Sequence, residues 1–343
     1  MNLRRIIVFI FPAIGCLFSF YGLIGCSNFD KRIVDKDVTG ISKYKLIKNW
    51  PQLPNGFVLG NPTGIGIDTN QNIFVFIRAG RAWSEPMPDS TISAKTVLML
   101  DRNSGKILNS WGADFFIMPH GLTVDKNNNI WVTDVALQQV FKFNHDGKLL
   151  MKLGEAKVAG NDSTHFNLPT DVAVAVDGSF YVSDGYGNNR IVKFSSTGKY
   201  LFEWGSKGDK PGEFNLPHGI DVDAKGNVYV ADRENNRIQQ FDFNGKFLNE
   251  WSSDSFGKMY SLAIDKSKNN LVAIDYLTMM AIPKGSNIII FDSTKQHTTL
   301  IGRSGLYDGT VCRYHDVAID NEGSIYVGDI LGNRIQKFKK TSP

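Results

Sequence analysis

The stretch "NVYVADRENNRIQQFD", Asn227 to Asp242, contains the two strand patterns on which the fold of this 343-residue chain depends. In "NVYVAD" and "NRIQQFD", large apolar residues alternate with small or polar ones, which is the period-two pattern of a β-strand. The polar residues between them include the asparagines that are typical of tight turns. The stretch therefore predicts two antiparallel strands joined by a short turn.

Related strands recur along the chain, so an internal repeat must be considered first. Six copies of the first pattern are "NIFVFIR", "NIWVTD", "SFYVSD", "NVYVAD", "NLVAID" and "SIYVGD", which begin at Asn72, Asn129, Ser179, Asn227, Asn270 and Ser324. A short strand precedes each copy, and most copies are followed by a third strand and a more variable fourth. Six units of about 50 residues, with four strands each, predict an all-β, six-bladed β-propeller over residues 44–340. Separate small domains are the alternative, but such short units without disulfides would be poorly stable alone.

The last unit stops after its third strand, at Phe338. The segment "KYKLIKNW", Lys43 to Trp50, precedes the first unit and is expected to supply the missing fourth strand. This pairing would close the ring and remove the exposed edges between the first and last blades.

The N-terminus reads as a targeting segment. Arg4 and Arg5 precede an apolar run that ends in "LIGC", which resembles the bacterial lipobox. We expect a lipoprotein signal peptide over residues 1–25, a lipidated Cys26 and a flexible tether over residues 26–43. Cleavage at "AIGC" before Cys16 and an uncleaved membrane anchor remain alternatives. We therefore expect a protein that is exported and lipid-anchored to the bacterial cell envelope, on a periplasmic or outer-membrane face.

The remaining chain has no features of a nucleic-acid-binding protein. Without Arg4 and Arg5 it carries 36 basic and 34 acidic residues, a near-neutral balance. Of the three cysteines, only Cys312 lies in the repeat region, so no internal disulfide can form there. The fold must then be stabilised by its core.

Histidines alternate around the predicted ring. The residues that begin the first strand of units one to six are Thr63, His120, Thr170, His218, Tyr260 and His315. Because first strands line the channel and alternate blades lie about 120° apart, three imidazoles are expected to converge on the axis. Three neutral imidazoles with one open position are the ligand set of a catalytic zinc. Ordinary polar residues at a channel mouth are the simpler alternative.

Other polar residues are assigned by their position in the repeat. Asp171 and Asp316 each follow the first residue of a first strand, one step deeper in the channel. A carboxylate with backbone carbonyls and water suits calcium, although an aspartate here is equally typical of a turn or cap. The other three histidines, His145, His165 and His297, fall in turns or outer segments and are expected at the surface.

The repeats resemble the NHL family, whose "D…N.RI..F" pattern occurs in "DGYGNNRIVKF", "DRENNRIQQF" and "DILGNRIQKF". The segments "MPHGLTVD", "LPHGIDVD" and "HDVAIDNEGSIYVGD" further resemble the peptidyl-α-hydroxyglycine α-amidating lyases, in a bacterial lipoprotein form. Members of that family are six-bladed propellers with one zinc on three histidines and one structural calcium. The resemblance implies that His120, His218 and His315 bind zinc. It also implies a calcium site formed by the carbonyls of Ile65 and Leu122 with the carboxylate of Asp316.

The resemblance also implies catalytic roles for Tyr186, Arg78 and Arg233, which follow second strands and are expected near the channel mouth. Tyr186, with a pKa lowered by nearby cations, is the expected base. Arg233 or Arg78 is expected to hold a substrate carboxylate with its planar guanidinium. Salt bridges within the loops are the alternative role for both arginines. Arg313, two residues before His315, stands where the family has a methionine.

These features together predict a zinc-dependent lyase. It would cleave the C–N bond of peptidyl-α-hydroxyglycine or a related carbinolamide and release an amide and glyoxylate. We expect a monomer that acts on small molecules or on peptide C-termini. A non-catalytic NHL propeller lipoprotein that binds a protein or glycan at the cell envelope is the main alternative. A calcium-dependent lactonase is a third, against which the three histidines argue, because such sites consist mainly of carboxylates and asparagine.

Overall fold

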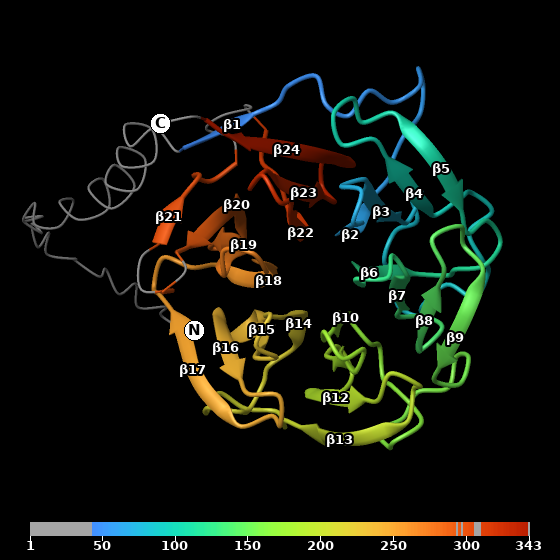
Figure 1. The fold of residues 1–343 in the computed structure, drawn as a ribbon, viewed down its shortest axis with the longest axis vertical. Coiled ribbons are helices and arrows are strands. Elements are labelled where there is room, and N and C mark those ends of the chain that lie inside the picture. The colour runs from blue at the N-terminus through green and yellow to red at the C-terminus, as the bar shows by residue number, and fades with distance from the viewer. Residues whose placement is uncertain (1–42, 293, 296–297, 305–309, 342–343) are drawn as a thin grey trace, which may run out of the picture. The chain divides into compact units, whose positions relative to one another are not determined.

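The structure is a computed structural model that describes residues 43–292, 294–295, 298–304 and 310–341. Within them, 24 strands form six four-stranded antiparallel sheets arranged in a ring (Figure 1). The predicted six-bladed β-propeller is confirmed. The expected signal peptide, Cys26, all but the last residue of the tether and His297 lie outside the described residues. The described part of the chain contains no helix with the length and hydropathy of a transmembrane span.

Each sheet is one blade, and in five of the six blades the strands follow the chain from the channel outward (Figure 1). Blade 1 consists of β2 (Pro62–Ile67), β3 (Ile73–Ile77), β4 (Val97–Leu100) and β5 (Ile107–Trp111). Blade 2 consists of β6 (Pro119–Val124), β7 (Ile130–Asp134), β8 (Gln139–Phe143) and β9 (Leu149–Leu153). Blade 3 consists of β10 (Asp171–Val174), β11 (Phe180–Asp184), β12 (Arg190–Phe194) and β13 (Tyr200–Trp204).

The second half of the ring repeats this plan. Blade 4 consists of β14 (Pro217–Val222), β15 (Val228–Asp232), β16 (Arg237–Phe241) and β17 (Phe247–Ser252), with a short 3-10 helix, η1, at Arg233–Asn235. Blade 5 consists of β18 (Lys258–Asp265), β19 (Asn270–Met279), β20 (Ile282–Phe291) and β21 (Thr298–Leu300). Blade 6 consists of β22 (Tyr314–Ile319), β23 (Ile325–Asp329), β24 (Arg334–Lys340) and the N-terminal strand β1 (Tyr44–Leu46).

The N-terminal strand closes the ring as predicted. Strand β1 pairs antiparallel with β24, and Leu46 lies opposite Phe338. The paired strand is shorter than the segment Lys43 to Trp50, and the last backbone bond from this segment to β24 is donated by Ile47 to the Lys337 carbonyl at 2.9 Å. Trp50 is instead buried at 5% exposure and packs edge-on against Tyr326, with ring centroids 5.2 Å apart. The segment after β1 therefore joins blade 6 to blade 1 by side-chain packing.

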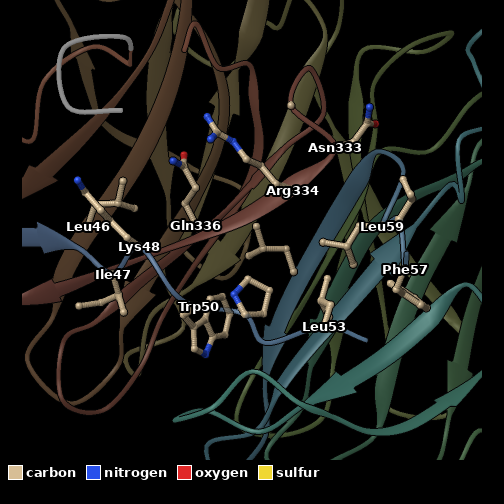
Figure 2. Close-up of a pocket in the computed structure, with 14 residues that line it drawn as sticks. Leu46, Ile47, Lys48, Trp50, Leu53, Phe57, Leu59, Asn333, Arg334 and Gln336 are labelled. Atoms are coloured by element: carbon tan, nitrogen blue, oxygen red, sulfur yellow. The ribbon is translucent and has the colours of Figure 1, made fainter. Parts of the chain in front are cut away.

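A cavity of about 740 Å³ lies at this junction, between the closing segment and β24 (Figure 2). Trp50, Leu53 and Phe57 line it on one side, and Arg334 and Gln336 on the other. None of its lining residues belongs to a first strand, so this cavity is part of the ring closure and not of the central channel.

A buried aspartate at the end of the second strand explains the repeat pattern. Asp232 accepts hydrogen bonds from the backbone N–H of Asn215 at 2.7 Å and from Nε of Arg237 at 2.8 Å. Asp184 and Asp329 make the same pair of bonds in blades 3 and 6. The aspartate thus fixes the segment that leads into the first strand against the third strand. The residues that follow it are thereby held at one mouth of the channel.

Candidate metal centre

The first strands bring three histidines together on the channel axis. His120 of β6, His218 of β14 and His315 of β22 are each at most 4% exposed. One ring nitrogen from each lies within 4.8 Å of those of the other two. The predicted convergence of the three imidazoles is therefore confirmed.

Each histidine is oriented by the neighbouring blade. The Nδ1 atoms of His120, His218 and His315 lie 2.7, 2.7 and 2.8 Å from the backbone carbonyl oxygens of Thr170, Tyr260 and Thr63. Because a carbonyl oxygen only accepts hydrogen bonds, Nδ1 must carry the proton, and Nε2 keeps its lone pair.

The surroundings keep the three rings neutral. Burial lowers the pKa of all three histidines well below its usual value. A cavity of about 10 Å³, lined by the three rings and by Asp171 and Asp316, lies beside them. A space of this size accommodates one small ion or water molecule. The donor set, its tautomers and the adjoining space all fit a metal ion.

Two carboxyl groups lie deeper in the channel. Asp316 accepts hydrogen bonds from the Ser261 hydroxyl and from the Ile65 backbone N–H, each at 2.6 Å. Asp171 lies on the opposite blade and accepts one from the Ile220 N–H at 3.1 Å. Burial raises the pKa of Asp316 to about 7, and burial together with the charge of Asp316 raises that of Asp171. Two buried, mutually repelling carboxyl groups are an environment that a cation would stabilise.

The residues assigned to calcium line one cavity. Ile65, Leu122 and Asp316 all border a space of about 450 Å³ on the far side of the aspartates from the histidines, and Asp171 borders it too. The close approach of the first strands depends on glycine here, since a Cβ on Gly121 would lie 2.6 Å from the Thr170 carbonyl oxygen. The structure thus brings together the residues expected at a second, oxygen-rich site.

Tyr186 lies directly against the histidine centre. Its hydroxyl is 3.1 Å from Nε2 of His120, 3.2 Å from Nε2 of His218 and 3.4 Å from a guanidinium nitrogen of Arg233. The expectation of a lowered pKa is wrong for this arrangement. Burial raises the pKa of Tyr186, and the charges of Arg233 and Arg78 offset that effect only in part.

Arg78 is a buried cation without a carboxylate partner among the described residues. It is 6% exposed, its Nε donates to the Pro119 carbonyl at 2.9 Å, and its Nη2 has no hydrogen-bond partner. Its Cζ lies 5.6 Å from the ring centre of Trp83. Because an unpaired buried charge is costly, this guanidinium is set up to receive an anion.

Arg233 is placed differently. It forms an ion pair with Glu234 at 2.9 Å, which in turn pairs with Lys258. Its Cζ also lies 5.4 and 5.1 Å from the ring centres of Tyr186 and Tyr260. The salt-bridge alternative therefore applies to Arg233 but not to Arg78.

An aromatic frame around the site could not be assigned from the sequence. Trp83, from the long loop between β3 and β4, packs on Tyr186 with ring centroids 5.0 Å apart. Tyr260 packs on His218 at 5.0 Å. Tyr260 stands near the start of a first strand, at the position that carries histidine in alternate blades. That position in the repeat was the signal by which its place beside the centre could have been found.

The other two histidines that the structure describes do not join the centre. His145 is not simply a surface residue, because it bonds the buried carboxylate of Asp68 at 3.0 Å. His165 lies in a loop and bonds Asp162 at 2.9 Å.

Comparisons with known proteins agree with this geometry. The NHL repeat model matches residues 116–143, 166–194 and 214–241. The chain is 34% identical over 330 residues to peptidyl-glycine alpha-amidating monooxygenase A of Xenopus laevis, covering 90% of this chain and 34% of that protein. It is 34% identical over 318 residues to peptidyl-alpha-hydroxyglycine alpha-amidating lyase 1 of Drosophila melanogaster, covering 84% of this chain and 58% of that protein. The chain thus spans between about a third and six tenths of these relatives.

A solved streptogramin B lyase structure has the same fold, with a TM-score of 0.55, 15% identity and coverage of 88% of both chains. At this identity the likeness concerns the fold alone. The two sequence relatives given above are named as amidating enzymes, and their similarity extends over most of this chain. The chain is therefore an NHL-repeat six-bladed propeller whose homologues include proteins named peptidyl-α-hydroxyglycine α-amidating lyases, at 34–39% identity.

Proposed function

We propose that this protein is a zinc-dependent lyase that cleaves the C–N bond of peptidyl-α-hydroxyglycine or a related carbinolamide. The products would be an amide and glyoxylate. The observation that carries the proposal is the buried centre of three neutral histidines in a chain whose homologues are named amidating lyases. Tyr186 and Arg78 at that centre supply the further groups that the reaction needs.

His120, His218 and His315 would hold the zinc through Nε2. When bound, the ion would act as a Lewis acid that lowers the pKa of the substrate hydroxyl. The carbonyls of Ile65 and Leu122 with the carboxylate of Asp316 would hold a structural calcium, consistent with the buried carboxyl groups that face this part of the channel.

The protein side chains bind the substrate and move its proton. Arg78, through its unpartnered Nη2, would bind the substrate carboxylate, and Arg233 would border the same space. As the C–N bond breaks and the hydroxyl oxygen forms a carbonyl, one proton must pass from that oxygen to the amide nitrogen. The hydroxyl of Tyr186, which lies next to two of the histidine Nε2 atoms, would carry it. The reaction balances without an oxidant or reductant.

The proposal includes the location of the enzyme. Cleavage before Cys26 and lipidation of that residue would anchor a monomeric propeller to the bacterial cell envelope through residues 26–43. The anchor is proposed from the sequence pattern "LIGC".

Metal analysis and glyoxylate release test the function together. The purified protein should contain about one zinc per chain and release glyoxylate from α-hydroxyhippurate. The His218→Ala variant should lose both properties, and the His165→Ala variant, which changes a loop histidine, should lose neither. A protein that takes up no zinc and releases no glyoxylate would favour a non-catalytic propeller, and full activity of His218→Ala would refute the role of the histidine centre.

A further inference from the structure

Arg313 lies in the same layer of the channel mouth as the two arginines assigned above. Its carbonyl oxygen accepts the backbone N–H of Ile330 at 3.0 Å, just before β22 begins. The equivalent bonds in blades 1 and 4 are donated by Arg78, to Asn61 at 3.2 Å, and by Arg233, to Leu216 at 3.1 Å. Arg313 is therefore level with Arg78 and Arg233, on the mouth where Tyr186 lies.

The guanidinium of Arg313 is held by two tyrosines. Its Nε donates to the hydroxyl of Tyr260 at 3.1 Å, and its Nη2 donates to the same oxygen. Its Cζ lies 5.3 and 5.1 Å from the ring centres of Tyr260 and Tyr276. The cation is thus oriented by neutral aromatic groups, and no carboxylate among the described residues pairs with it.

Tyr260 connects Arg313 to the histidine centre. Its ring packs on His218 at 5.0 Å, whereas its hydroxyl receives Arg313. A group bound at Arg313 would therefore lie about the length of a phenol ring away from the reacting atoms. If Arg78 binds the carboxylate beside the bond that breaks, as proposed above, Arg313 is left to contact the acyl part of the substrate.

The charge balance around the mouth favours a second anion. No carboxylate among the described residues lies within ion-pair distance of Arg313 or of Arg78. The carboxylate of Glu234 is shared between Arg233 and Lys258. One substrate carboxylate at Arg78 would leave Arg313 unneutralised.

We infer that Arg313 is a specificity-determining residue that binds a second carboxylate in the acyl part of the substrate. The inference rests on the proposed function. The preferred substrates would be α-hydroxyglycine amides of dicarboxylic acyl groups, or peptides with an acidic residue before the hydroxyglycine. Arg313 would hold the second carboxylate by charge-assisted hydrogen bonds from its free N–H groups.

Two matched substrates test the inference: N-succinyl-α-hydroxyglycine and its uncharged analogue N-succinamoyl-α-hydroxyglycine. The wild type should show a kcat/KM about tenfold or more higher for the charged substrate. Arg313→Met should remove that preference through KM, and leave the uncharged substrate within about twofold of wild type. Arg313→Lys should retain part of it. Arg102→Met, which removes an arginine paired with Glu322 at the surface, is the control and should keep the full preference.

The outcomes separate the two proposals. Equal kcat/KM for the two substrates, or an equal loss on both in Arg313→Met, would refute the role of Arg313 and leave the lyase function standing. If neither substrate yields glyoxylate, the lyase function fails. Calorimetric binding of N-succinylglycine and N-succinamoylglycine, which lack the hydroxyl, then decides the role of Arg313. Tighter binding of the charged ligand in the wild type, lost in Arg313→Met, supports that role. Equal binding of the two ligands refutes it.

Discussion

Replacing Arg78 with methionine should greatly lower enzymatic activity while leaving the stability of the fold almost unchanged. Arg78 is buried and makes one hydrogen bond through Nε, to the Pro119 carbonyl, while its Nη2 has no partner. Methionine keeps much of the side-chain volume and removes the charge. The variant loses one charged hydrogen bond but is relieved of a buried, unpaired cation, so the free energy of unfolding should stay within about 1 kcal/mol of wild type.

The loss of activity should be much larger. Two charge-assisted hydrogen bonds to a substrate carboxylate contribute about 1.5 kcal/mol each, so Arg78→Met should lower kcat/KM about 100-fold. Zinc content should not change, because Arg78 is not a ligand in the proposal. Glyoxylate release from α-hydroxyhippurate measures the first effect, and urea unfolding measures the second.

Arg237→Met is the matched control. Arg237 is equally buried, at 5% exposure, but it pairs with Asp232 at 2.8 Å and with Glu250 at 2.9 Å. Its loss leaves a buried carboxylate unpaired, which should cost about 3–5 kcal/mol. The reasoning is refuted if Arg78→Met destabilises the protein as much as Arg237→Met, or if it leaves kcat/KM unchanged.

Four further predictions follow from other parts of the molecule. Tyr186→Phe should lower kcat at least about 100-fold without loss of zinc, and an unchanged kcat would exclude its proton-carrying role. A calcium-selective chelator should lower the melting temperature by at least about 2 °C, reversibly on adding Ca²⁺, and Asp316→Asn should not respond. Trp50→Ala should cost about 3–5 kcal/mol in urea unfolding, and a cost below about 1 kcal/mol would contradict its role in ring closure. Cys26→Ser should abolish incorporation of labelled fatty acid in cells and release the protein from the membrane fraction; continued incorporation would place the lipid elsewhere.

Much of the fold could be predicted because its determinants are local. The alternation in "NVYVAD" and the Asp–Arg pairing of "DRENNRIQQF" act between residues close in the sequence, as the bond from Arg237 to Asp232 shows. The length of β19 and β20 was harder to predict. Strand β19 continues past Asp275 to Met279 and β20 begins at Ile282, whereas the second strands of blades 2, 3, 4 and 6 end at the aspartate. The alternation of apolar and polar residues does not indicate that these two strands are longer than their counterparts.

For the candidate site, the sequence predicted which backbone positions lie close together, but not how the side chains pack around them. The positions of His120, His218 and His315 in the repeat were sufficient to bring them together. The surroundings of Tyr186 were not, because burial by side chains from several blades raises its pKa, against the expectation from nearby cations alone. The unpartnered Nη2 of Arg78 likewise depends on how side chains pack, which no spacing in the sequence records.

The hydrogen bonds that orient the three histidines do not involve the side chains of the accepting residues, which alternate with the histidines around the ring. Thr170, Tyr260 and Thr63 accept those bonds through their main-chain carbonyls, so exchanging their side chains deletes no acceptor. The acceptors themselves are therefore independent of side-chain identity, although the buried hydroxyl of Thr170 also donates to the carbonyl of Pro217, next to His218. In this chain one of these three positions carries the phenol that holds Arg313. A substitution at such a position can thus change substrate recognition in one blade, while the main-chain acceptors of the histidine centre stay the same.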